Sequence, residues 1–233
     1  MHVIIINGSP RTREFSNTAK IIHSFVKGLE KEIVTYELYS LSNLGEWDSA
    51  RKAFLTNDKI IFALPMYVDS IPSLILEFLE TLQSQVLSTS GIGYISNEEG
   101  GGRTLSFILH GGFDEGSQFR LCEKLLKSIT IQLGCNYGGC LIKGGSFFLR
   151  LFERDKVERM TKPYTKMGIS YARHGNFVTP EAKRFTGPEC YPWLVRQFTG
   201  IFLKLVVNKK FEQFALDWGC YEPLDNKPYA QIK

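Results

Sequence analysis

The chain has 233 residues, of which 43% are hydrophobic and 22% are charged, and its formal net charge is +4. This composition is typical of a globular protein with a sizeable core. Lysine and arginine are spread along the chain, which argues against nucleic-acid binding, and no apolar stretch reaches the roughly 18 residues of a membrane span. The amino terminus lacks the basic and long apolar regions of a signal peptide, so we expect a cytoplasmic protein.

The charge balance and the cysteine content narrow the class of protein. A small electron carrier that docks by charge usually has a strongly one-signed surface, so this nearly balanced chain is more typical of an enzyme that takes anionic small molecules. The five cysteines are odd in number and scattered, which predicts reduced and mostly buried thiols. They lack the close spacing of an iron–sulfur site, and no other metal cluster is apparent.

Short apolar runs that alternate with helical patterns predict a parallel sheet. The first run, Val3 to Ile6, is β-branched and stops at Asn7-Gly8-Ser9-Pro10, which is typical of a strand buried on both faces. From Ser16 onward the apolar residues recur at helical spacing. The five predicted strands cover residues 3–6, 33–39, 59–64, 104–109 and 139–143. Their alternation with helices predicts an open, doubly wound α/β fold with right-handed crossovers.

Two regions depart from this alternation. Residues 84–102 are rich in serine and glycine, which predicts a long mobile loop. Beyond residue 148 the pattern becomes helical, with helices expected over 155–173 and 191–206. We therefore expect one domain at residues 1–148 and a helical extension at residues 149–233.

The stretch Asn7-Gly8-Ser9-Pro10-Arg11 and the Ser16-Asn17-Thr18 that follows are the most informative part of the sequence. A phosphate monoester needs several convergent donors, and a helix amino terminus offers free N–H groups and the positive end of its dipole. The side-chain donors in these two segments are Ser9, Arg11, Ser16, Asn17 and Thr18. The alternative is that Ser16 merely caps the helix and Arg11 lies in solvent. We favour a phosphate site, although the stretch is neither a Walker loop nor a dinucleotide fingerprint.

Three segments resemble one family. The Gly-Ser-Pro-Arg loop with the following Ser-Asn-Thr is similar to the FMN-phosphate loop of NADPH-dependent FMN reductases and flavodoxin-like NAD(P)H:quinone oxidoreductases. Residues 63–72, Ala-Leu-Pro-Met-Tyr-Val-Asp-Ser-Ile-Pro, resemble the Pro-x-Tyr stretch that lines the flavin ring in that family. His110-Gly111-Gly112-Phe113 takes the position of its other ring-side loop. The resemblance covers about the first 145 residues, while residues 84–102 and the carboxy-terminal extension depart from the compact family pattern.

The resemblance implies a flavodoxin-like sheet of order 2-1-3-4-5 that binds FMN. Ligands of such sheets bind beyond the carboxyl ends of the strands, at the switch between the first and third strands, where the two better motifs lie. The implied cofactor-binding residues are Ser9, Arg11, Ser16, Asn17, Thr18, Pro65, Met66, Tyr67, Val68, His110, Gly111 and Gly112. Taken alone, Tyr67 would be an ordinary half-buried tyrosine, and a lone histidine is more often packed or on the surface than a ligand.

The family further implies an FMN-dependent oxidoreductase. Hydride from NADPH or NADH would reach a quinone, a flavin or another small acceptor by a ping-pong mechanism. No catalytic residue is identified, as expected where the cofactor carries the chemistry. Two alternatives remain open, a flavodoxin-like electron carrier and a non-catalytic flavin-binding module that docks through its helical tail.

The predicted helix over 191–206 carries an apolar stripe. Its members are Leu194, Val195, Phe198, Ile201, Phe202 and Leu205. We expect this stripe to pack on the body or on a second subunit, which would give a homodimer. The alternative is a basic amphipathic segment on a membrane surface, because Lys204, Lys209 and Lys210 stand beside Phe211, Phe214 and Trp218.

Overall fold

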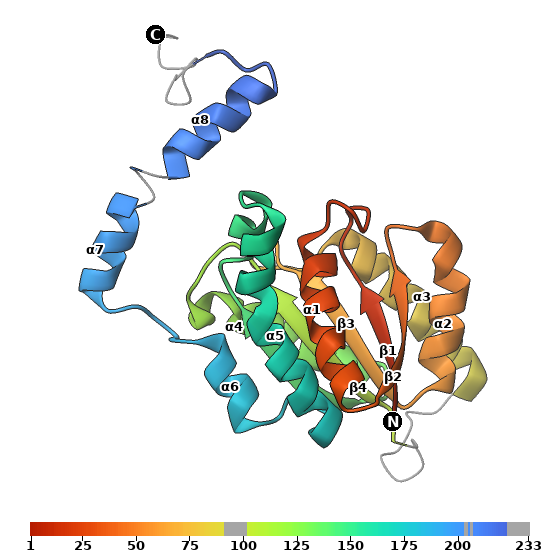
Figure 1. Ribbon diagram of the computed structural model, residues 1–233. Coiled ribbons are helices and arrows are strands. Elements are labelled where there is room, and N and C mark those ends of the chain that lie inside the picture. Colours follow the sequence, from red (N-terminus) through yellow and green to blue (C-terminus); the bar gives the residue numbers. More distant parts are fainter. Residues whose placement is uncertain (91–101, 203–204, 206, 223–233) are drawn as a thin grey trace. The chain divides into compact units, whose positions relative to one another are not determined.

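The computed structural model describes residues 1–90, 102–202, 205 and 207–222 (Figure 1). The chain divides into two compact units, Met1–Glu189 and Cys190–Lys233. The first unit holds the α/β fold that the sequence predicts, and the second holds the carboxy-terminal helices.

The first unit is built on a five-stranded parallel sheet of order β2-β1-β3-β4-β5, which confirms the predicted order. The strands are β1 (His2–Asn7), β2 (Thr35–Ser40), β3 (Lys59–Pro65), β4 (Thr104–His110) and β5 (Asn136–Lys143). The unbroken apolar runs of β1, β3 and β4 are buried because helices cover both faces of the sheet. The register pairs Asn7 with Ala63 and Pro65 with His110, so the carboxyl ends of β1, β3 and β4 share one edge.

Two helical layers enclose the sheet. One face is covered by α1 (Asn17–Lys31), α5 (Arg154–His174) and α6 (Pro180–Thr186), and the other by α2 (Trp47–Thr56), α3 (Ser73–Ser90) and α4 (Arg120–Gln132). Figure 1 shows α1 and α5 lying together in front of the sheet. The unit also contains the 3₁₀ turns η1 (Leu44–Glu46), η2 (Gly116–Phe119) and η3 (Ser146–Arg150). Cys122, Cys135 and Cys140 are buried in this core, whereas Cys190 and Cys220 are exposed.

The structure corrects several element predictions. α3 continues to Ser90, so the loop expected over 84–102 is wrong for residues 84–90, and residues 91–101 lie outside the described part. A helix whose earlier turns are held by buried Ile75 and Phe78 propagates through polar residues at little further cost. Sequence reasoning also gave no helix at α2, and within the predicted helical extension it named no separate helix at α6 or at α8 (Asn208–Asp217).

α1 and α5 pack backbone against backbone. A Cβ atom on Gly28 would overlap the carbonyl oxygen of Thr165, and one on Gly168 would overlap the carbonyl oxygen of Phe25. The Thr165 hydroxyl donates to the Ser24 carbonyl oxygen at 2.8 Å across the same crossing. α5 is therefore part of the first unit, which extends past residue 148, where the sequence places the end of the flavodoxin-like domain.

The second unit contains α7 (Trp193–Phe202) and α8. Of the apolar stripe predicted from the sequence, α7 exposes Leu194 at 61%, Phe198 at 71% and Ile201 at 56% of their full accessibility. No described residue of this unit covers the stripe. None of the helices in the described ranges is long and apolar enough to cross a bilayer.

The glycine crossing makes a prediction about stability. Gly28→Ala and Gly168→Ala should each lower the free energy of unfolding by roughly 1–3 kcal/mol, although alanine favours a helix, because the added methyl forces two backbones apart. Urea titration followed by circular dichroism should show a lower midpoint at constant slope. Lys166→Ala, at an exposed position of α5, is the control and should stay within about 0.5 kcal/mol of the wild type. Unchanged midpoints in both glycine variants would contradict the close crossing.

Candidate functional site

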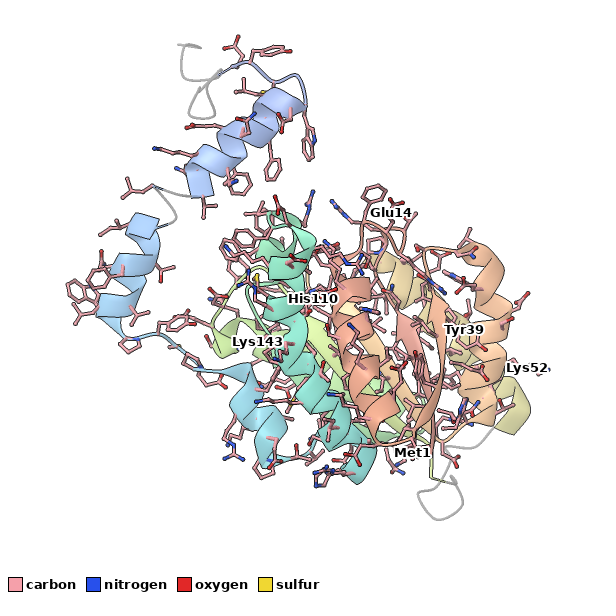
Figure 2. The ribbon with its side chains drawn as sticks, viewed as in Figure 1. Met1, Glu14, Tyr39, Lys52, His110 and Lys143 are labelled. Carbon is pink, nitrogen blue, oxygen red and sulfur yellow. The ribbon has the colours of Figure 1, made fainter. Side chains whose placement is uncertain are left out.

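A pocket opens at the carboxyl edge of the sheet. Figure 2 shows His110 toward the end of the sheet away from Met1, as the parallel topology requires. The cavity measures about 290 Å³, near the lower end of the range for small-molecule sites. It is lined by Ser9, Arg11, Phe15, Asn17, Thr18, Pro65, Met66, Tyr67, Val68, His110, Gly111, Gly112, Ser146, Phe147 and Arg150.

The pocket brings together every residue predicted from the sequence except Ser16. Ser16 is wholly buried, and its Oγ accepts the N–H of Ala19 at 3.1 Å. It is therefore the N-cap of α1, the alternative reading of its position. The N–H groups of Asn17 and Thr18, in the first turn, make no hydrogen bond to any residue that the structure describes, so they remain available to a ligand.

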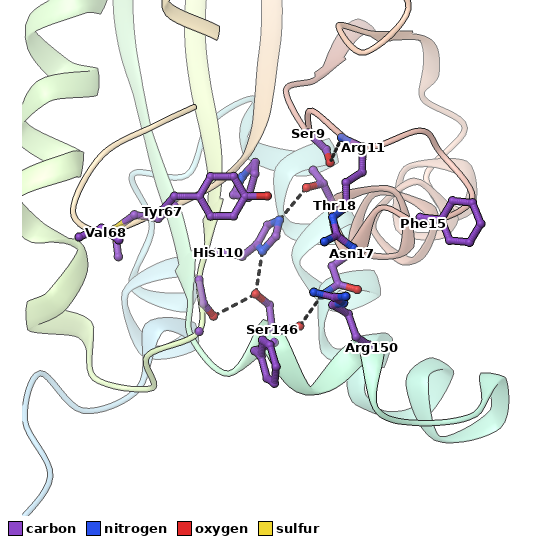
Figure 3. A pocket seen from close by; sticks show the side chains of 15 residues that line it. Ser9, Arg11, Phe15, Asn17, Thr18, Tyr67, Val68, His110, Ser146 and Arg150 are labelled. Atoms are coloured by element: carbon purple, nitrogen blue, oxygen red, sulfur yellow. Dashed lines mark hydrogen bonds between the residues drawn. The ribbon is translucent and has the colours of Figure 1, made fainter. Parts of the chain in front are cut away.

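The buried side chain of His110 joins three segments of the chain (Figure 3). Its Nε2 lies 2.8 Å from Thr18 Oγ1 on α1, and its Nδ1 lies 2.8 Å from Ser146 Oγ on η3. The Ser146 hydroxyl also donates to the carbonyl oxygen of Gly111 at 2.9 Å. A hydroxyl has one proton and a carbonyl can only accept, so Ser146 must accept from Nδ1–H. Nε2 consequently carries no proton and accepts from the Thr18 hydroxyl.

These bonds decide what the neighbouring side chains can offer to a ligand. The Thr18 hydroxyl donates its proton to His110, so it is not available as a donor to a ligand. Asn17 Nδ2 donates to the Ser146 carbonyl oxygen at 2.8 Å, which leaves one amide proton. Ser9 Oγ accepts the N–H of Arg11 at 3.2 Å and keeps its own proton for a ligand.

Positive charge gathers on one side of the pocket. Arg11 and Arg150 both line it, and neither belongs to an ion pair in the described part of the chain. Arg13, by contrast, pairs with Glu46 at 3.1 Å. Partial burial, and after it the charge of Arg11, lower the pKa of Arg150. An anion bound here would relieve this repulsion.

The opposite side of the pocket is apolar and conformationally strained. Tyr67 and Ser70 close a tight turn through two backbone hydrogen bonds of 2.9 and 3.2 Å. Its central residues, Val68 and Asp69, have φ angles of 43° and 66°. A β-branched residue in this left-handed region is a rare and costly conformation. Val68 is also 89% exposed, so burial does not compensate for the strain, and such strain is typical of ligand-binding loops.

Sequence reasoning missed four pocket residues. Phe15 precedes the cap of α1, while Ser146, Phe147 and Arg150 belong to η3, which follows β5. The available signal was the Gly144-Gly145 pair that ends the last strand. Gly145 has a φ of 71°, and a Cβ on Gly144 would overlap the backbone of Phe113. A turn that tight indicates a chain that folds back beside the loop after β4.

Residues 1–117 match the model of a family described as having a flavodoxin-like fold. The chain belongs to this flavodoxin-like family. A search among curated proteins found no match.

Solved structures of the flavodoxin-like fold include several similar to this chain. An azoreductase from Bacillus anthracis str. Sterne is 15% identical with a TM-score of 0.52, over 74% of this chain and 99% of that one. RosB, solved with 8-demethyl-8-formylriboflavin-5'-phosphate bound, is 13% identical with a TM-score of 0.53, over 88% and 87%. The apo form of an NADH:FMN oxidoreductase, EMOB, is 18% identical with a TM-score of 0.51, over 80% and 96%. At these identities the likeness shows the fold.

The environment of His110 predicts a pH dependence of stability. Burial lowers the pKa of His110 from 6.5 to about 3, so the folded protein keeps the ring neutral where the unfolded chain takes up a proton. Above about pH 6.5 the histidine is neutral in both states and does not change the free energy of unfolding. As the pH falls from 6.5 toward 3, the free energy of unfolding decreases by about 1.4 kcal/mol per pH unit. In urea titrations between pH 7 and pH 4, the free energy of unfolding of His110→Gln should fall less steeply with decreasing pH than that of the wild type. Equal slopes for the wild type and the variant would exclude a neutral buried imidazole.

Proposed function

We propose that the pocket binds FMN and that the protein is an NAD(P)H-dependent oxidoreductase. One observation carries this proposal: a cationic end and an apolar aromatic end share one pocket, at the point where the connections after β1 and β3 turn to opposite faces of the sheet. Open α/β sheets bind their ligands at this switch point. A flavin mononucleotide has the matching polarity, with a phosphate at one end and an aromatic ring at the other.

The residues present fit this cofactor. The first turn of α1, the Ser9 hydroxyl and the Arg11 guanidinium would hold the phosphate. Met66, Tyr67 and Val68 would hold the ring, and Tyr67 is half-exposed toward the cavity (Figure 3). When bound, FMN would supply a ring that accepts and donates hydride.

The protein's own part in the reaction would be to position the reactants. The titratable residues that line the pocket are Arg11, Tyr67, His110 and Arg150. His110 is neutral and has both ring nitrogens engaged, so it can hold Thr18 and Ser146 in place but is not a free acid or base. The nicotinamide donor and then the acceptor, a quinone, a flavin or a nitro compound, would take turns on the open side, which gives ping-pong kinetics.

The names of the similar structures support this proposal. One is an NADH:FMN oxidoreductase, one is an azoreductase, and RosB was solved with a riboflavin 5'-phosphate derivative. A flavin carrier or a non-catalytic flavin-binding module would use the same fold, so turnover decides between them and the enzyme. A cytoplasmic location, as expected from the sequence, belongs to the same proposal.

The first functional prediction concerns Arg11. Its loss should weaken FMN binding by roughly tenfold to a hundredfold, because a charge-assisted hydrogen bond contributes about 1.5–3 kcal/mol. Riboflavin, which lacks the phosphate, should bind weakly to the wild type and equally to Arg11→Ala. Fluorescence titration measures both affinities. Ser16→Ala should weaken FMN binding less than Arg11→Ala does, because Ser16 caps α1 and the helix N–H groups remain.

Steady-state oxidation of NADH and NADPH completes this test. The FMN-loaded protein should turn over nicotinamide with a quinone as acceptor, giving parallel double-reciprocal lines. A yellow protein without turnover would indicate the carrier or the module. Protein that binds riboflavin as tightly as FMN would place the phosphate elsewhere and contradict the assignment.

We also propose that the exposed stripe of α7 packs against a second copy of the chain. Large exposed apolar patches are typical of interfaces. Light scattering after size exclusion should give twice the mass of one chain, and Phe198→Asp should give the single-chain mass. Gln197→Asp, an exposed polar neighbour on α7, is the control and should stay dimeric. A monomeric wild type that sediments with vesicles only when residues from Tyr191 onward are present would favour the membrane alternative.

A further inference from the structure

Both ends of η3 are hydrogen-bonded to side chains at the start of α1. Asn17 Nδ2 donates to the Ser146 carbonyl oxygen at 2.8 Å, and Lys20 Nζ donates to the Leu149 carbonyl oxygen at 3.0 Å. Each of these bonds joins residues 129 positions apart in the sequence. Because Arg150 is the last residue of η3, the two bonds bring its side chain to the wall of the pocket beside the first turn of α1.

The cationic side chains around η3 affect one another electrostatically. Arg150 is influenced by the charge of Arg11, and Lys20 in turn is influenced by the charge of Arg150. Burial first, and then Arg150, lower the pKa of Lys20. Among the described residues that line the pocket there is no acidic side chain. Arg11 and Arg150 repel each other, and there is no carboxylate among the described residues that line the pocket with them, so the two arginines form a site suited to an anion of more than one charge.

The neutral donors, which include the Ser9 hydroxyl and the N–H groups at the start of α1, supply hydrogen bonds but no full positive charge. Thr18 gives its proton to His110, Ser16 is buried as the cap, and Asn17 has one amide proton left. Arg11 supplies one positive charge, whereas the phosphate of a flavin mononucleotide carries nearly two negative charges at neutral pH. The other guanidinium in the pocket, that of Arg150, can supply the second compensating charge.

We propose that Arg150 is a second phosphate-binding residue, which neutralises the cofactor phosphate together with Arg11. This inference rests on the proposed FMN site and adds to it a residue that selects the phosphorylated flavin over riboflavin. Arg150 lies beyond residues 1–117, the part of the chain that matches the flavodoxin-like family model. Lys20 acts through the Leu149 carbonyl oxygen and is a positioning residue for η3.

The test compares FMN with riboflavin on the full-length protein. Arg150→Ala should weaken FMN binding about tenfold and leave riboflavin unchanged, because only FMN carries the phosphate. Arg150→Lys should recover part of the affinity, since it keeps the charge but loses the planar fork. Arg154→Ala is the matched control: Arg154 is exposed and pairs with Glu158 at 3.4 Å, so its loss should leave both affinities within about twofold.

Two further measurements separate a phosphate contact from a structural role. The FMN affinity of Arg150→Ala should fall less steeply with rising salt than that of the wild type, because one charge contact has been removed. The melting temperature of the FMN-free variant should match that of the wild type. Arg150→Ala that weakens FMN and riboflavin equally would show damage to η3 and overturn the inference.

The remaining outcomes distinguish this inference from the function on which it rests. If Arg11→Ala weakens FMN and Arg150→Ala does not, the FMN site stands and the role of Arg150 is refuted. If the wild type does not bind FMN at all, the proposed function is refuted, and the role of Arg150 falls with it.

Discussion

The buried imidazole of His110 holds together three segments that the sheet alone would only bring close. It accepts from Thr18 at the start of α1 and donates to Ser146 on η3, while Ser146 donates to the backbone of Gly111 after β4. Leaving one of these buried polar groups without a partner would reduce the stability of the fold by about 1–3 kcal/mol. Each group in this hydrogen-bond network therefore fixes the position of the others. The shape of the pocket floor depends on it.

This arrangement also separates two kinds of polar group at the site. Hydroxyl and amide groups are mostly used within the protein, where they fix the backbone of the loops. The arginines remain for the ligand, and the strained Tyr67-Val68-Asp69-Ser70 turn presents an aromatic surface opposite them. Charge and apolar surface are thus set in place before any ligand arrives, which reduces the ordering cost of binding.

Much of the fold could be predicted from the sequence, because its strands are buried on both faces and appear as unbroken runs such as Val3 to Ile6. The loops after β1, β3 and β4 could be predicted as site loops because parallel strands have their carboxyl ends at one edge of the sheet. Ser16 was harder to interpret, because a helix cap and a phosphate donor use the same residue types. Arg150 could not be predicted, since its position depends on contacts from Asn17 and Lys20 far away in the sequence.

The long separation between α1 and η3 has a consequence for how the protein matures. A nascent chain can form β1, α1 and β3 early, but the bonds from Asn17 and Lys20 to η3 close only after residue 150 has been synthesised and the last strand has paired. Contacts between segments so distant form late, because the loop between them must first be ordered. The same few bonds can open locally while the sheet stays intact. Breaking the two bonds would free η3 from α1 without removing any hydrogen bond of the sheet.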